Sequence, residues 1–360
     1  MPPSKVDLNR RISLQRLGEA ALSAFGVTAL SGSALADPVE VPPIARRAAP
    51  PSRLDAGVLD PSWPPPRALE VWVPEGKGGN GEALCKAMAP RLKEAFALNT
   101  QFRMMGDASP IEVLQQAARG TIDGASLAYI DQRSLILEPA LTVGAKFALG
   151  DFHPVTWLAS RPYLFCTNRR VISKNLREWL ARAVERPGVM NFGSAGRGTP
   201  GHLVAEALLM DAGVQTQHVP YPSERHAVIA AIANEVQAVI LDPVIAVPEI
   251  KAGRLRALAV TSSRRLDGMP EIRTAAAQGV TGFNAVQWAG FAMPRGVAEV
   301  TVTKMHAVLS RAVDDHDTQH DLLKSYWQPV GEGPEAFSNM IRSENERWNT
   351  LVRRLGLRAS

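Results

Sequence analysis

From residue 69 onward, short apolar runs alternate with longer segments in which apolar residues recur every three or four positions. The run at 69–73 (LEVWV) predicts a strand, and Leu84, Met88 and Leu92 after it have the spacing of one helix face. This alternation is typical of βαβ units, so it predicts an α/β fold in which helices flank mostly parallel sheets. Further strands are predicted at 101–105, 124–129, 162–167, 189–192, 218–221, 238–242, 255–261 and 287–293, and further helices at 111–118, 176–184, 199–208, 227–233, 300–313 and 337–355.

The N-terminal part of the chain has a different composition. An arginine pair at 10–11, a mildly apolar stretch at 20–30 and an Ala-Leu-Ala triplet ending at Ala36 follow one another in the order of a twin-arginine export signal. We therefore expect residues 1–36 to be a signal peptide that is removed near Ala36, which predicts a periplasmic protein. The proline-rich segment 37–67 is expected to be an extended leader. A chain of 360 residues is long for one domain, which favours two.

Charge and cysteine content narrow the classes of partner. The formal net charge is +5, but no run of lysine and arginine with interleaved aromatic residues accompanies it, so nucleic acid is not an expected partner. The chain has 2 cysteines, Cys85 and Cys166, both in apolar settings. Two buried free thiols are favoured, and a disulfide stays open as the alternative. Cysteine-rich zinc spacings are absent, so no metal is expected.

A glycine-rich segment, NFGSAGRGTPGHL, joins a predicted strand to a predicted helix. Glycine at Gly193, Gly196 and Gly198 lets the backbone take positive φ and approach a ligand closely. Thr199 suits the N-cap of the helix, and Pro200 suits its first position. The N-terminus of a helix carries unpaired N–H groups and partial positive charge, so this loop is a candidate site for a carboxylate or phosphate. The alternative is a tight turn without a ligand.

Two enzyme classes are alternative interpretations of these patterns. The segment 76–81 (GKGGNG) matches G-x-G-x-x-G after a strand, and Asp107 ends the next strand, as in a dinucleotide-binding oxidoreductase. However, Pro74 and Glu75 interrupt the junction between strand and glycines, the distance to the acid is long, and the chain is expected to be exported. This reading is kept as the alternative, but no cofactor is expected.

A hydrolase would use Ser194, His202 and Asp242 as a catalytic triad. The serine lies in Gly-Ser-Ala-Gly, which lacks the G-x-S-x-G spacing of a nucleophile elbow. Catalysis is therefore not expected. Asp242 ends a predicted buried strand before a proline, so it could cap the following helix or contact a ligand, and both interpretations stay open.

Four motifs in this order and spacing resemble a known family. They are 191–199 (NFGSAGRGT), 218–221 (HVPY), 251–261 (KAGRLRALAVT) and 293–296 (MPRG). The chain from about Leu69 to Leu357 resembles the substrate-binding proteins of tripartite tricarboxylate transport systems, also known as TctC-like or Bordetella-uptake-gene receptors. The resemblance is carried by the set, since each motif alone is weak.

The resemblance implies a two-lobed periplasmic binding protein of type II with a ligand cleft between the lobes. Lobe 1 would comprise residues 68–161 and 284–360, and lobe 2 residues 162–283. Such a receptor captures a small carboxylate and passes it to membrane transporter subunits or to a sensor kinase. A monomer that is not an enzyme is expected.

Position by position, the resemblance and the residue pattern together nominate a set of ligand-binding residues. They are Pro74, Glu75, Lys77, Gly78, Gly79, Ser194, Ala195, Gly196, Gly198, Thr199, His202, Tyr221 and Asp242. The departures from the family pattern cluster in the first lobe, at Glu75, Lys77, Glu82 and Asp131. The second half of the site therefore carries over more directly than the first, and the identity of the ligand does not carry over. Trp288 is a further candidate for the cleft.

Overall fold

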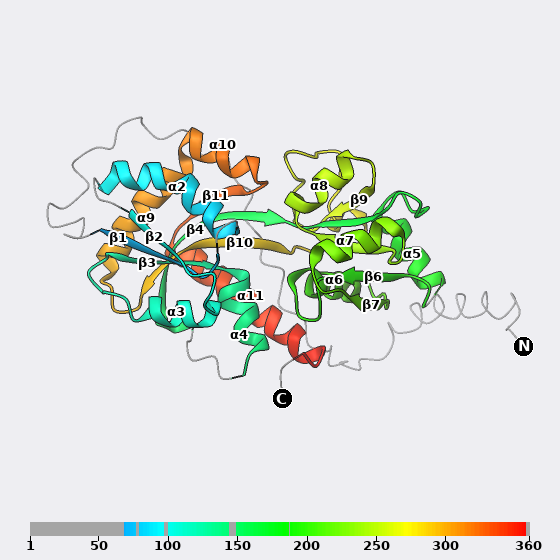
Figure 1. Ribbon diagram of the computed structural model, residues 1–360, viewed down its shortest axis with the longest axis horizontal. Coiled ribbons are helices and arrows are strands. Elements are labelled where there is room, and N and C mark those ends of the chain that lie inside the picture. Colours follow the sequence, from blue (N-terminus) through cyan, green and yellow to red (C-terminus); the bar gives the residue numbers. More distant parts are fainter. Residues whose placement is uncertain (1–67, 77–78, 97–99, 144–148, 187, 358–360) are drawn as a thin grey trace, which may run out of the picture. The chain divides into compact units, whose positions relative to one another are not determined.

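The strands form two separate sheets in the computed structural model, which describes residues 68–76, 79–96, 100–143, 149–186 and 188–357 (Figure 1). All of these residues belong to one unit of the chain. The signal peptide and the leader expected at 1–67, together with Lys77 and Gly78, lie outside the described residues.

The first sheet has the strand order β11-β4-β10-β3-β1-β2, and the second has the order β7-β6-β8-β5-β9. The strands of the first sheet are β1 (Leu69–Val73), β2 (Thr100–Met104), β3 (Ser126–Asp131), β4 (Phe152–Pro162), β10 (Val286–Pro294) and β11 (Gln328–Glu332). Those of the second are β5 (Leu164–Asn168), β6 (Asn191–Ser194), β7 (Gln217–Pro220), β8 (Ala238–Leu241) and β9 (Leu255–Val260). The predicted α/β class with two lobes is confirmed.

Both sheets are mixed, whereas the sequence favoured mostly parallel ones. Strand β1 pairs in parallel with β2 and β3, and β6 pairs in parallel with β7 and β8. The antiparallel pairs all involve the strands next to the two passages between the sheets: β10 with β3 and β4, β11 with β4, and β5 with β8 and β9. Only Tyr163 separates β4 from β5. Because no helix reverses the chain at this passage, the order that gives parallel βαβ pairing is broken there.

Helices cover both faces of each sheet. In the first sheet, Val71 of β1 packs with the apolar faces of α2, α9 and α10, whereas the next residue, Trp72, packs on the side of α3 and α11. In the second sheet, α7 and α8 share one buried cluster with the strands, and α5 and α6 belong to another. The α-helices are α2 (Asn80–Phe96), α3 (Pro110–Ala118), α4 (Glu138–Leu141), α5 (Leu176–Glu185), α6 (Pro200–Asp211), α7 (Glu224–Ala233), α8 (Pro243–Lys251), α9 (Glu299–Asp314), α10 (His316–Lys324) and α11 (Pro334–Arg354). A short π-helix, η1 (Arg133–Leu137), and two 3₁₀ turns, η2 (Leu149–Asp151) and η3 (Ala276–Gln278), complete the set.

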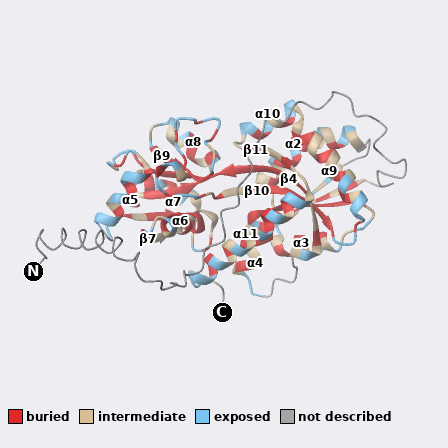
Figure 2. Cartoon of the chain, turned by 180° about the vertical axis from the view of Figure 1, so that it is seen from behind, coloured by how far each residue is buried: buried red, intermediate tan, exposed pale blue. Residues whose placement is uncertain are grey.

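Burial follows this layering, with buried residues on the strands and exposed ones on the outer sides of the helices (Figure 2). Cys85 and Cys166 are both buried and free, as favoured from the sequence. None of the described helices combines the length and the apolar character that crossing a membrane requires.

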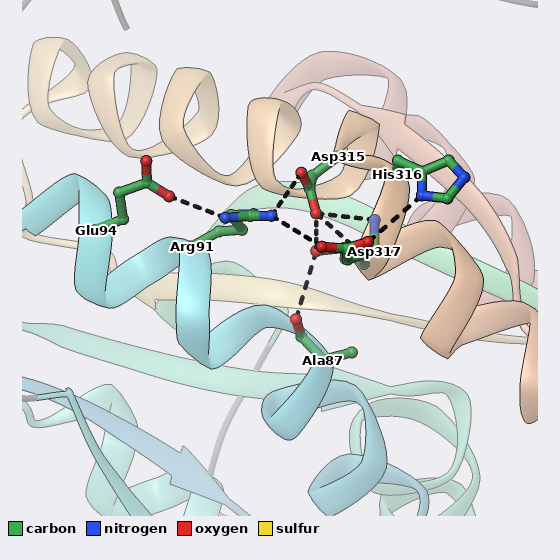
Figure 3. Close-up of polar contacts among 7 residues, drawn as sticks. Ala87, Arg91, Glu94, Asp315, His316 and Asp317 are labelled. Atoms are coloured by element: carbon green, nitrogen blue, oxygen red, sulfur yellow. Dashed lines mark hydrogen bonds and ion pairs between the residues drawn. The ribbon is translucent and has the colours of Figure 1, made fainter. Parts of the chain in front are cut away.

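A polar cluster ties α2 to the start of α10 (Figure 3). The Arg91 guanidinium donates to Asp315 at 2.9 Å and to Glu94 at 3.1 Å. Asp315 is also the N-cap of α10, where its carboxylate accepts the backbone N–H groups of Asp317 at 3.1 Å and Thr318 at 3.0 Å. The same carboxylate therefore caps the N-terminus of α10 and joins this helix to α2.

Candidate functional site

A pocket of about 480 Å³ is lined by residues of both lobes. Its walls come from the C-terminal ends of β1 and β3 in the first lobe and of β6 and β8 in the second, together with residues of β10. The C-terminal ends of parallel strands are where open α/β sheets bind ligands. The glycine-rich loop between β6 and α6 lies in the wall formed by the second lobe.

That loop requires its glycines. Gly196 and Gly198 have φ values of 121° and 82°, a region that side-chain-bearing residues rarely adopt. Thr199 is the N-cap of α6, as predicted, but its side chain makes no capping bond. Its hydroxyl instead donates to the carbonyl oxygen of Gly196 at 2.8 Å. The first turn of α6 therefore reaches the pocket wall without the side-chain cap that usually occupies a helix N-terminus.

Two side chains hold the loop from behind. The Ser194 hydroxyl accepts the N–H of Gly196 at 3.1 Å, and His202 Nδ1 accepts the N–H of Gly198 at 3.0 Å. His218 Nε2 lies 2.7 Å from the Ser194 hydroxyl, and the two imidazole rings are 3.9 Å apart between centroids. Burial lowers the pKa of His202 to about 3, with help from His218 and Arg197. Burial, aided by Arg197, also lowers the pKa of His218 to about 4, so both rings are neutral at pH 7.

The three residues of the hydrolase alternative do not meet as a triad. The Ser194 hydroxyl pairs with His218 rather than with His202. The Asp242 carboxylate accepts hydrogen bonds from Arg161, from Gln287 at 2.8 Å and from the N–H of Val244 at 2.9 Å. The serine thus supports the loop, and the aspartate caps α8.

The first lobe contributes a pair of acids to the pocket. Glu75 follows β1 and accepts the N–H of Gly81 at 2.6 Å. Asp131 ends β3 and accepts the N–H and the hydroxyl of Ser134 at 2.7 and 2.6 Å. Burial and then the neighbouring charge of Asp131 raise the pKa of Glu75 to about 7. On the opposite side, burial raises the pKa of Glu224 to about 7.

A buried arginine connects the two lobes behind these walls. Arg161, near the end of β4, is 1% exposed, and its guanidinium lies 4.5 Å from the ring centroid of Trp327. One of its nitrogens, Nη2, donates to Asn80 at 2.8 Å, to Gln287 at 3.2 Å and to Asp242. Asp242 caps α8, which confirms one of the two interpretations, and it also lines the pocket, where its contact with a ligand stays a prediction.

The structure brings part of the predicted site into the pocket. Six of the predicted residues line it, namely Glu75, Ser194, Ala195, Gly198, Thr199 and Asp242. Five others are described but do not line it, namely Pro74, Gly79, Gly196, His202 and Tyr221. The Tyr221 ring packs against Gly193, where an added Cβ would come within 3.1 Å of it. Ligand contact by these residues stays a prediction, and so does that of Lys77 and Gly78, which are not described.

Sequence reasoning missed several polar residues of the pocket region. These include Asn80, Tyr129, Arg133, Arg161, Arg197, Glu224 and Gln287. The one available signal was Arg161, the single charged residue in the stretch from Val155 to Cys166. A buried charge of this kind needs partners.

The same geometry disfavours a dinucleotide at the 76–81 segment. The first turn of α2 would have to receive the pyrophosphate. The N–H of Gly81 there already donates to the Glu75 carboxyl group, which places an acid where the phosphates would lie.

Comparison with known proteins shows which family the chain belongs to. Residues 105–357 match the family described as "Tripartite tricarboxylate transporter family receptor". The chain belongs to this family. A curated relative of the receptor, the UPF0065 protein in the tcbD-tcbE intergenic region of Pseudomonas sp. (strain P51), is 28% identical over 290 residues, which are 80% of this chain and 86% of that one. BugT of Bordetella pertussis is 24% identical over 295 residues, 81% of this chain and 90% of that one.

Solved structures share the fold of the receptor. A TctC solute-binding protein from Polaromonas superposes with a TM-score of 0.73 at 21% identity, over 81% of this chain and 99% of that one. MatC from Rhodopseudomonas palustris, solved with bound malate, superposes with a TM-score of 0.63 at 24% identity, over 80% of this chain and 99% of that one. The type II periplasmic-binding-protein fold implied by the sequence is thereby confirmed.

Proposed function

We propose that this chain is a periplasmic solute receptor that captures a small carboxylate between its lobes and passes it to a tripartite transporter. The observation that carries this proposal is the uncapped N-terminus of α6 at the wall of the pocket. Membership of the family supports it, as do the malate bound to MatC and the adipate bound to a second protein of R. palustris with this fold.

The ligand carboxylate would lie against the first turn of α6. Gly201 and Thr199 line the pocket there, and Arg197 adds a positive charge from the same loop. Two indole N–H groups belong to the same pocket region: Trp288 and Trp327 line it, and neither Nε1 has a hydrogen-bond partner among the described residues. Unpaired buried donors are costly, and a carboxylate can accept from several of them. A volume of about 480 Å³ is adequate for a small organic acid.

The wider scheme follows from this binding mode. Residues 68–161 with 284–360 would be the first lobe and 162–283 the second, which would close on the ligand. Residues 1–36 would direct export by the twin-arginine route, and the mature receptor would act as a monomer. A sensor kinase is a second candidate for the membrane partner.

Calorimetric titration of the purified protein, from residue 37 onward, tests the proposal. We expect one binding site per chain for at least one small carboxylate from a panel that spans mono-, di- and tricarboxylates with and without amino groups. The ligand should be recovered unchanged, because a receptor does not transform it. Absence of binding across the panel, or turnover of a bound acid, would overturn the proposed function.

A further inference from the structure

Three oxygen-bearing side chains of the first lobe meet at one corner of the pocket. Strands β1 and β3 are parallel neighbours in which Val71 pairs with Leu127 and Trp72 with Ala128. Continuing that register sets Val73 beside Tyr129 and Glu75 beside Asp131. Glu75, Tyr129 and Asp131 all line the pocket.

Each of the two carboxyl groups is only partly satisfied by the protein. One oxygen of Glu75 accepts the Gly81 N–H, and one oxygen of Asp131 accepts both donors of Ser134. The Glu75 side chain also lies within hydrogen-bonding reach of Asp131, and that bond exists only while one of the two groups is protonated. Two carboxylates at such a distance repel, and burial strengthens the repulsion.

Tyr129 gives an independent indication of a ligand. Its side chain is fully buried, yet its hydroxyl has no hydrogen-bond partner among the described residues. A buried hydroxyl without a partner is costly, and most such groups in folded proteins are paired. The Tyr129 ring belongs to the same corner as Glu75, since a Cβ added at Gly81 would lie 3.1 Å from Cε1 of the ring and 3.2 Å from a Glu75 carboxylate oxygen.

A primary ammonium group matches this set of oxygens. It has three N–H donors and no acceptor, and it carries the charge that two adjacent carboxylates lack. A metal ion is a poorer match, because the described residues contain no group of three or more metal-binding side chains. The cation Arg133 also lines the pocket, but it is 59% exposed and pairs with Glu138 at 2.9 Å.

We propose that Glu75, Asp131 and Tyr129 bind the ammonium group of a ligand whose carboxylate lies at α6, so that the receptor takes small amino acids in preference to plain carboxylic acids. This inference rests on the proposed function, because it assumes that the carboxylate site at α6 exists. The first lobe would bind the ammonium group of the ligand, and the second lobe its carboxylate.

Titration with matched pairs of acids tests the preference. The pairs are aspartate and succinate, glutamate and glutarate, and 4-aminobutanoate and butanoate. We expect the amino member of at least one pair to bind tenfold or more tightly than its partner. If the plain acids bind as tightly as the amino acids or more tightly, the ammonium site is wrong and the carboxylate receptor stands. If no acid of either kind binds, the proposed function fails with it.

Two variants locate the preference. Glu75→Gln should remove tenfold or more of the affinity for the preferred amino acid and leave the plain partner's affinity unchanged or higher. Tyr129→Phe, which removes one oxygen atom, should reduce the same preference by a smaller factor. Glu70→Gln is the matched control, since Glu70 lies on β1 but pairs with Arg103 away from the pocket. Retention of the full preference in both Glu75→Gln and Tyr129→Phe would overturn the inference.

Discussion

At the level of single residues, the buried ion pair between Arg161 and Asp242 joins the two lobes beside the pocket. Both side chains are largely withdrawn from solvent, at 1% and 14% exposed, so each depends on the other for charge compensation. Removing one partner of a buried ion pair typically costs about 3–5 kcal/mol, because the remaining charge is left uncompensated. A pair at the surface contributes much less.

We therefore expect Asp242→Asn to lower the free energy of unfolding by about 3–5 kcal/mol, as measured by urea denaturation. Asparagine can still accept the Val244 N–H, so the cap of α8 is retained and the loss reports on the charge. Asp321→Asn is the control, since it breaks the exposed pair with Lys324 and should cost less than about 1 kcal/mol. Similar losses for the two variants would show that Arg161 does not depend on this partner.

Glu75 gives the ligand-free protein a dependence of stability on pH. Burial and the charge of Asp131 raise its pKa to about 7 in the folded protein, from 4.5 for an unperturbed glutamate. Between these two values the folded state holds a proton that the unfolded state has lost. Stability therefore falls as the pH rises through this window and is lowest above it.

Glu75→Gln should remove that contribution, since glutamine stays neutral. We expect the variant to gain stability relative to the parent between pH 5 and pH 8, on the order of 2–3 kcal/mol. Thermal denaturation without ligand at the two pH values measures it. An equal difference between variant and parent at both pH values would contradict the assigned role of Glu75.

Residues of the site differed in how far the sequence could reveal them. The loop from Ser194 to Thr199 was found because its glycines and its N-cap lie within a few positions of one another in the sequence. Asp242 was found because an acid ended an apolar strand. Arg161 and Gln287, by contrast, are 126 positions apart and become neighbours only through the pairing of β4 with β10. No local pattern carries such a contact, because it depends on which strands pair.

At the scale of elements, periodicity was sufficient wherever an element had a regular apolar face. The strand predicted at 69–73 is β1, and the helix predicted at 111–118 is α3, one residue longer. The elements that the pattern did not predict include most of β4, η1 with α4, α8, α10 and β11. Helix α8 contains two prolines, α10 is largely polar, and β11 is a short strand that contains proline and glycine. Tertiary contacts stabilise these segments against their local preferences.

The loop between β6 and α6 offers a test at this scale. Gly196→Val should abolish carboxylate binding, because a β-branched residue is strained at a φ of 121° and the loop would have to rearrange. Gly213→Val is the matched control: its φ is also positive, at 67°, and an added Cβ there meets nothing within 4 Å. Calorimetry should show binding in the control and none in the loop variant, with both proteins folded by circular dichroism. Unchanged binding by a folded Gly196→Val protein would exclude this loop as the anion site.

At the scale of the whole molecule, the question is what couples the two lobes. The chain passes between them at Tyr163 and again between β9 and β10. Arg161 lies beside the first passage, and Gln287, paired with it in register, lies beside the second. One guanidinium nitrogen of Arg161 donates both to Asn80 of the first lobe and to Asp242 of the second. These shared hydrogen bonds favour a state in which both lobes contact Arg161 at the same time.

Asn80→Ala should weaken that coupling. The substitution removes the bond to Arg161 at 2.8 Å and the longer contact with Gln287 at 3.5 Å. A net loss of about 1 kcal/mol for the shorter of these two bonds predicts a ligand affinity roughly fivefold weaker. Because Asn80 also lines the pocket, affinity alone does not separate coupling from direct contact.

Small-angle X-ray scattering without ligand separates the two effects. If Asn80 couples the lobes, the Asn80→Ala variant should have a larger radius of gyration than the parent. Asn349→Ala, which breaks only contacts with Asn345 on the same helix, should scatter like the parent. If Asn80→Ala also scatters like the parent but binds more weakly, Asn80 acts on the ligand itself and the lobes are coupled by other contacts.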